Sequence, residues 1–232
     1  MSALAIVNAR ILDPATNADF TGACLIEDGL FVELTRGTGW TPPQGVEVID
    51  AQGLCLSPGL IDIRVKTGEP GSEPKETLKS ASLSAAAGGV TTIVIQPDTD
   101  PAIDDPAMIE FIQRRGAALG LVNVRAAGAA TKGRDGTRMA EIGLMDEAGA
   151  LYFTDGDRVI ANSRTLQRVM SYAAAFNALI ACRPADPWLS EGAVATSGEL
   201  ATRLGLASAP AIAERIQLDR DLALVEQTGA RS

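Results

Sequence analysis

The sequence contains no histidine among its 232 residues. Histidine is the commonest metal ligand and the usual general base near neutral pH, so its absence excludes imidazole metal centres and histidine-activated nucleophiles from this chain. The three cysteines, Cys24, Cys55 and Cys182, lie far apart and form no Cys-x-x-Cys pair. This spacing predicts neither a disulfide framework nor a thiolate metal site, and we expect reduced thiols.

Positive charge is scarce as well. Twenty lysines and arginines face 29 aspartates and glutamates, which gives a net charge of −9. Nucleic acids and anionic membranes require a basic face, so we expect neither as a partner. No apolar run approaches the ~20 residues that span a bilayer, and the N-terminus lacks the pattern of a secretory signal. We therefore expect a cytoplasmic globular protein.

The first part of the chain, residues 1–57, has the pattern of a small β domain. Short apolar and β-branched runs, which predict strands at 4–12, 23–27, 30–34 and 46–50, are separated by turn residues. Asp28-Gly29 between two of these runs predicts a tight hairpin.

Residues 58–232 alternate between strand and helix patterns, which is typical of a parallel sheet built from βα units. Strands are expected at 60–66, 90–96, 121–127, 150–153 and 178–182. Ser72 and Asp105 are the expected N-caps of the first two helices. About five βα units are present where a closed barrel has about eight. The expected fold is therefore an incomplete (β/α) barrel, and we expect the chain to be a piece of a longer product that continues after Ser232.

Several short motifs add a more specific signal when taken together. They are Pro58-Gly59-Leu60-Ile61-Asp62, Glu69-Pro70-Gly71, Gly88-Gly89-Val90-Thr91-Thr92, Pro97-Asp98-Thr99-Asp100-Pro101, Thr131-Lys132-Gly133 and Arg203-Leu204-Gly205-Leu206. As a set they resemble the dihydroorotase branch of the cyclic amidohydrolases, which are zinc-dependent hydrolases of cyclic amides. The resemblance implies an α/β fold with a TIM-type (β/α) barrel of the metal-dependent hydrolase type, a small β-sandwich-like N-terminal domain and a place in pyrimidine biosynthesis.

The resemblance also implies where a catalytic site would lie, and there the sequence departs from the family. Arg64 and Lys66 stand at the positions of two metal-binding histidines, and Arg183 at that of a third. Gly68 replaces an arginine that binds the substrate carboxylate, and Asp98 replaces an asparagine that contacts substrate.

Two carboxylates complete the implied site. Asp155 matches a carboxylate ligand of the family. Asp62, in the first-strand motif, is expected to support the neighbouring site residues without binding the metal itself. Asp157 is interpreted as a turn residue beside Gly156.

Arg64, Lys66 and Arg183 are cations at neutral pH and offer no lone pair to a metal. We predict that they replace the charge of the metal and neutralise the three carboxylates Asp62, Asp98 and Asp155. No metal site and no cofactor are therefore expected.

The first functional hypothesis is a catalytically inactive dihydroorotase homologue, a pseudoenzyme that forms homo-oligomers and acts as a structural partner of aspartate transcarbamoylase. A second is an active amidohydrolase of the dihydroorotase or hydantoinase type, with ligands supplied from a missing C-terminal part. A third is an anion-binding module that uses the cationic mouth. The metal content of the full-length protein separates the second hypothesis from the other two.

Overall fold

The computed structural model describes residues 3–232, which divide into two compact units. The first unit extends to Gly59 and the second runs from Leu60 to Ser232. The sequence pattern changes at nearly the same place, between residues 57 and 58.

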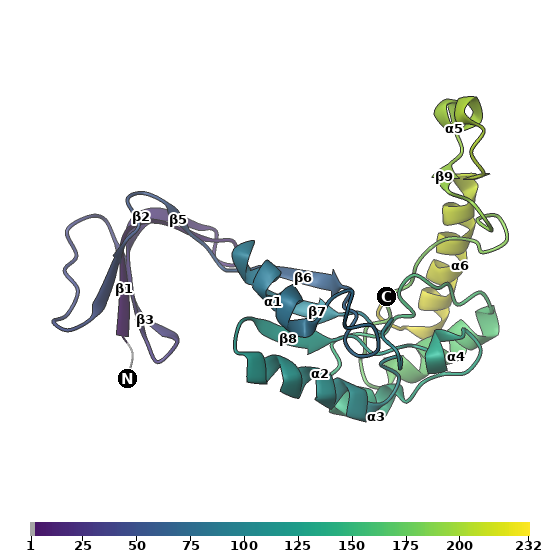
Figure 1. Cartoon of the computed structure of the whole chain (residues 1–232), viewed down its shortest axis with the longest axis horizontal. Helices are drawn as coiled ribbons and strands as arrows, with labels where there is room; N and C mark the ends of the chain where they lie inside the picture. Colours follow the sequence, from purple (N-terminus) through teal and green to yellow (C-terminus); the bar gives the residue numbers. More distant parts are fainter. Residues whose placement is uncertain (1–2) are drawn as a thin grey trace. The chain divides into compact units, whose positions relative to one another are not determined.

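The first unit is one mixed five-stranded sheet (Figure 1). Its strands are β1 (Ala3–Asp13), β2 (Ala18–Glu27), β3 (Leu30–Arg36), β4 (Glu47–Asp50) and β5 (Cys55–Leu56). The order is β3-β2-β1-β4, with β5 also paired to β1. Asp28 and Gly29 join β2 to β3 with positive φ angles of 49° and 80°, which the predicted two-residue hairpin requires.

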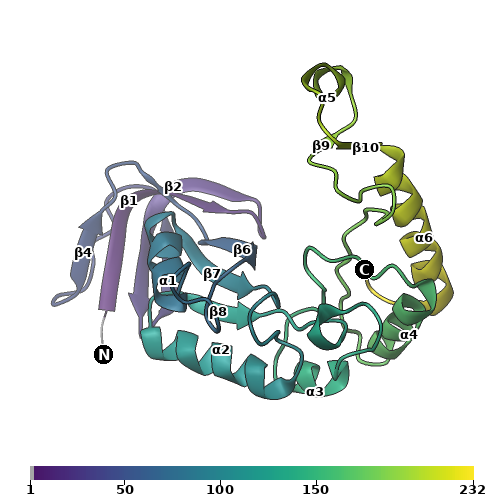
Figure 2. The same ribbon diagram turned by 45° about the vertical axis from the view of Figure 1, so that its right-hand side comes forward.

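The second unit begins with a parallel sheet in the order β6-β7-β8 (Figures 1 and 2). Its strands and helices are β6 (Leu60–Val65), α1 (Leu78–Ala87), β7 (Val90–Ile95), α2 (Pro106–Leu119) and β8 (Asn123–Ala126). Each strand is followed by a helix that returns the chain to a neighbouring parallel strand, which is the βα repeat that the sequence predicts. The fold class is thus α/β, an incomplete (β/α) barrel.

The fourth and fifth expected strands are shorter than predicted. Phe153 forms isolated parallel bridges to Gly128 on one side and to Ile180 on the other. The barrel order is therefore kept, but the positive φ angles of Gly149 and Gly156 leave only a short extended segment around Phe153.

Two helices lie between the bridged residues in the sequence. Helix α3 (Ile142–Glu147) lies between Gly128 and Phe153, and α4 (Ser163–Ala174) lies between Phe153 and Ile180. Arg231 pairs in parallel with Leu179, next to the fifth strand position.

Of the two predicted helix N-caps, one is confirmed and the other is wrong. Asp105 caps α2, and its side chain accepts a hydrogen bond from the backbone N of Met108. Ser72 does not cap α1, because that helix starts five residues later with Thr77 as N-cap in a capping box with Ser80. Residues 68–76 instead form a loop closed by backbone hydrogen bonds.

The core of the second unit lies between the parallel strands and the helices. Its fully buried members include Ile93 and Ile95 of β7, Ile109 and Ile112 of α2, and Phe153. One face of α4 is buried as well, with Leu166, Val169, Met170 and Ala173 all in the core.

The last part of the chain forms an extended arm. It contains β9 (Ala195–Thr196), α5 (Glu199–Leu204), β10 (Ser208–Ala209) and α6 (Ile212–Thr228). Figures 1 and 2 place α5 beyond the start of α6, away from the parallel sheet. Within residues 3–232, none of the helices combines the length and the apolar character needed to cross a bilayer.

Candidate functional site

The candidate site begins at an irregular segment of β6. The register between β6 and β7 breaks between Asp62 and Val65. Inside this segment the carbonyl oxygen of Ile63 accepts hydrogen bonds from the Tyr152 hydroxyl and from Nε2 of Gln96. These bonds fix the end of β6, from which Arg64 and Lys66, two residues apart, project to one face.

Five charged residues meet at this end of the sheet, and we name them the cation cluster: Arg64, Lys66, Asp98, Asp157 and Arg183. Arg64 Nη2 lies 2.6 Å from Asp157 Oδ1, and Lys66 Nζ donates to the other oxygen of Asp157. Lys66 Nζ also lies 3.0 Å from Asp98 Oδ2. Arg183 Nη1 donates to the backbone oxygen of Asp157 at 2.7 Å.

The charges in this cluster stabilise one another. The hydrogen bond from Lys66 lowers the pKa of Asp157, and the hydrogen bond to Asp157 raises the pKa of Lys66. Both groups are therefore charged at neutral pH. Since Lys66 also reaches Asp98, one ammonium group compensates two carboxylates.

Two of the three carboxylates expected to meet these cations do not. Asp155 is buried, with 3% of its surface exposed, and its two oxygens accept from the backbone N and the Oγ1 of Thr131 at 2.9 and 2.5 Å. Burial raises the pKa of Asp155. Asp62 accepts from the backbone N of Arg64 and forms no ion pair within residues 3–232. The pairing predicted for these two residues is wrong, because Thr131 satisfies both oxygens of Asp155 and the backbone N of Arg64 donates to one oxygen of Asp62.

Asp157 occupies the place that the sequence analysis gave to Asp155. Asp157 lies in a turn beside Gly156, as expected, and in addition it binds both Arg64 and Lys66. Asp155 and Asp157 are two residues apart, but Gly156 between them has a φ of 65° and turns the chain, so their carboxylates reach different partners. Gly156 signals the turn, but the sequence pattern does not distinguish which of the two aspartates meets the cations.

Gly68 is enclosed by the loop of residues 68–76. A Cβ atom on Gly68 would lie 2.0 Å from the backbone oxygen of Ser72 and 3.0 Å from that of Glu76. The position where the resemblance implies an arginine clamp therefore has no room for any side chain while this loop keeps its conformation.

Asp98, in the substrate-contact position, is only 13% exposed, and its Oδ1 has no hydrogen-bond partner among the described residues. Its other oxygen is held by Lys66.

A pocket of about 680 Å³ opens beside the cation cluster. Arg64, Asp157 and Arg183 are its charged lining residues, and Ile63, Tyr152 and Leu179 are among those that provide its apolar wall. Pockets of this size are typical of small-molecule sites.

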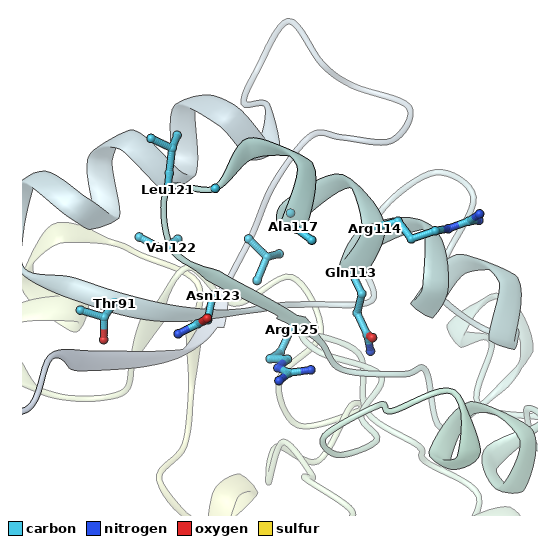
Figure 3. A pocket seen from close by; sticks show the side chains of 11 residues that line it. Thr91, Gln113, Arg114, Ala117, Leu121, Val122, Asn123 and Arg125 are labelled. Carbon is cyan, nitrogen blue, oxygen red and sulfur yellow. The ribbon is translucent and has the colours of Figure 1, made fainter. Parts of the chain in front are cut away.

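A second pocket of about 690 Å³ lies at the other end of the strands, between α2 and β8 (Figure 3). Figure 3 shows Arg114 on α2 and Arg125 on β8 extending in different directions, without converging on one point. Sites in (β/α) barrels form at the carboxyl ends of the strands, so the pocket beside the cation cluster is the candidate site.

Comparison with known proteins agrees with the fold described above. Residues 53–231 match the family model described as dihydro-orotase-like. The chain belongs to this dihydroorotase-like family. It is 39% identical over 227 residues to a dihydroorotase of Pelobacter propionicus, and 39% identical over 224 residues to one of a Sulfurihydrogenibium species. These alignments cover 98% and 97% of this chain but 53% and 52% of the relatives, so the chain spans about half of their length.

Solved structures show the same fold. An L-hydantoinase from Arthrobacter aurescens superposes with a TM-score of 0.77 at 21% identity, over the whole of this chain and 52% of that enzyme. A D-hydantoinase superposes with a TM-score of 0.73 at 19% identity, over 98% of this chain and 50% of that enzyme.

The zinc centre of the dihydroorotase family does not fit the residues of this site. Zinc takes deprotonated thiolate, imidazole or carboxylate ligands. Within residues 3–232 no group of three or more such side chains is arranged to hold a metal. The cluster instead presents two guanidinium groups and an ammonium group, which carry the same sign of charge as the metal.

Proposed function

We propose that this protein is a catalytically inactive member of the dihydroorotase-like family, which acts in pyrimidine biosynthesis as a structural partner of aspartate transcarbamoylase. The observation that carries the proposal is the position of Lys66. Its ammonium group binds Asp98 and Asp157 at once, so the charge that a metal would supply is already provided by the chain.

The substrate side of the site supports the same proposal. The loop of residues 68–76 closes on Gly68, so the carboxylate clamp that the family resemblance implies has no equivalent at this position. Asp98 adds a carboxylate where the resemblance implies a neutral amide. A carboxylate repels an anionic substrate, which opposes dihydroorotate binding in the family orientation.

A second candidate is an active amidohydrolase. The 39% identity to curated dihydroorotases favours it, together with the fact that about half of their length has no counterpart in this chain. In this case Asp157 and residues from outside the chain would have to bind the metal against three nearby cations.

Metal analysis of the purified full-length protein tests the proposal. After incubation with zinc and extensive dialysis, the inactive homologue should retain no stoichiometric zinc. One or two zinc ions per chain, together with dihydroorotate hydrolysis, would establish the active enzyme instead.

Copurification tests the partner. Full-length protein expressed with the aspartate transcarbamoylase of the same organism should elute with it in size-exclusion chromatography. Separate elution at micromolar concentrations of both proteins would refute the structural partnership and leave the metal result unaffected.

A further inference from the structure

We propose that the pocket between Arg64 and Arg183 binds a small organic carboxylate. This activity is separate from the structural partnership, and it concerns the pocket of about 680 Å³ beside the cation cluster.

The lining of the pocket carries a net positive charge. Its charged lining residues are two arginines and one aspartate, so cations exceed carboxylates there although the whole chain has a net charge of −9. Asp157, the single carboxylate, is also bound by Lys66 from the other side. An anion entering the pocket therefore meets a local excess of positive charge.

The two guanidinium groups both contact Asp157. Arg64 reaches the side chain of Asp157 at 2.6 Å, and Arg183 reaches its backbone oxygen at 2.7 Å. Both guanidinium groups also line the same pocket, so both face a ligand that enters it. Each has five N–H donors and uses only one nitrogen in the hydrogen bonds formed here, which leaves donor pairs for a bidentate carboxylate.

The wall of the pocket decides the kind of anion. Ile63, Leu179, Ala181 and the ring of Tyr152 line the same space. The Tyr152 hydroxyl and Gln96 are already bonded to each other and to the Ile63 carbonyl oxygen, so this side offers mainly apolar contact. A planar carboxylate with an apolar body satisfies both sides of the pocket, whereas a fully hydrated inorganic anion satisfies one.

The test uses benzoate as a probe and the neutral, isosteric benzamide as its matched control. Titration calorimetry of the full-length protein at low ionic strength should show saturable benzoate binding that weakens with added salt, and no benzamide binding. In an NMR titration the Arg64 and Arg183 side-chain Nε–H signals should shift with benzoate.

Variants locate the site. Arg183→Gln should weaken benzoate binding by roughly tenfold or more, because a charge-assisted bidentate pair is lost. Arg183→Lys keeps the charge without the planar fork, and it should bind with intermediate affinity. Arg203→Gln on α5, which removes an exposed arginine outside the pocket, should bind benzoate like the parent protein.

Circular dichroism and the urea midpoint establish that each variant is folded, and Arg183→Lys serves as the test if Arg183→Gln does not fold. Equal binding of benzoate and benzamide would overturn the proposal, as would unchanged benzoate affinity in folded Arg183 variants or no saturable binding. None of these outcomes depends on the zinc content or on the transcarbamoylase partner.

Discussion

Lys66 differs from the other cations of the site because it holds two carboxylates. Its side chain is 49% exposed, whereas Asp98 is 13% exposed. A surface ion pair contributes about 0–1 kcal/mol, while leaving a buried charge unpaired costs about 3–5 kcal/mol. The Lys66–Asp98 pair lies between these cases, because solvent reaches the ammonium group but hardly reaches the carboxylate.

Lys66→Met should therefore lower the free energy of unfolding by about 2 kcal/mol, mainly because Asp98 loses its counter-ion. Urea denaturation measures the change. Arg215→Met is the matched control, since the pair of Arg215 with Asp219 is exposed at both ends and should contribute under about 0.5 kcal/mol. Adding Asp98→Asn to Lys66→Met should restore part of the loss, and an additive double variant would contradict the assigned pair.

Asp157 makes the free energy of unfolding depend on pH in the acidic range. Its folded-state pKa lies below the unfolded value of about 3.9, so its contribution is present above that pH and is lost as the pH falls through the folded-state pKa. Asp155 acts in the opposite sense, because burial raises its pKa and its contribution is lost as the pH rises through the folded-state value.

Asp157→Asn should therefore reduce the unfolding free energy at about pH 6 by about 1 kcal/mol or less, since Asp157 is 43% exposed, and the difference from the parent should shrink toward about pH 2. Urea midpoints measured across this range test the sign. A difference that grows as the pH falls would show that Asp157 is not stabilised as the anion.

At the scale of elements, the loop between β6 and α1 decides what the substrate side of the site can hold. The backbone N of Gly68 donates to the oxygen of Glu76 at 2.9 Å, so the loop returns to its own start. A similar close approach joins α2 to β8, where a Cβ on Gly116 would lie 2.3 Å from Cβ of Val124. In both places a missing side chain lets two segments meet.

Gly68→Ala should lower the unfolding free energy by about 2 kcal/mol or more, because its Cβ meets backbone rather than a movable side chain. Gly88→Ala is the control, since its nearest contacts would lie at 3.6 Å and its φ of −89° suits alanine. It should change stability by less than about 0.5 kcal/mol. Thermal or urea unfolding compares the two, and equal stability would show that the loop adapts.

At the scale of the whole molecule, the parallel sheet has an exposed first strand. Leu60, Ile61 and Ile63 of β6 are each more than 60% exposed within this chain. The curated relatives are about twice as long as this chain.

Restoring histidines at the three cationic positions should restore zinc binding before it restores hydrolysis. The variant carries Arg64→His, Lys66→His, Arg183→His and Asp98→Asn in the full-length chain, and leaves Gly68 unchanged because arginine does not fit there. It should retain about one zinc ion per chain after dialysis, since ligands suffice for affinity whereas turnover also needs positioned substrate groups.

The matched control keeps Arg183 and changes only Arg64 and Lys66 to histidine. The remaining guanidinium reaches the same residue, Asp157, and should oppose the incoming ion by roughly several kcal/mol. Elemental analysis compares both proteins with the parent. Equal zinc retention in the control and the full variant would show that Arg183 lies outside the metal position.

The sequence alone determined the local elements and the family. Periodicity predicted the βα order, and turn chemistry predicted the hairpin at Asp28-Gly29 and the Asp105 cap, because these features depend on neighbouring residues. It also determined that three cations stand where the family resemblance implies metal-binding histidines.

Only the tertiary structure decided which carboxylates meet those cations. Asp155 and Asp157 are two residues apart and chemically identical, yet Thr131, which is distant in sequence, satisfies one of them while Lys66 and Arg64 bind the other. The closure of residues 68–76 over Gly68 was likewise set by backbone hydrogen bonds across the loop. Such choices depend on which distant groups are close in space, and spacing along the chain does not encode them.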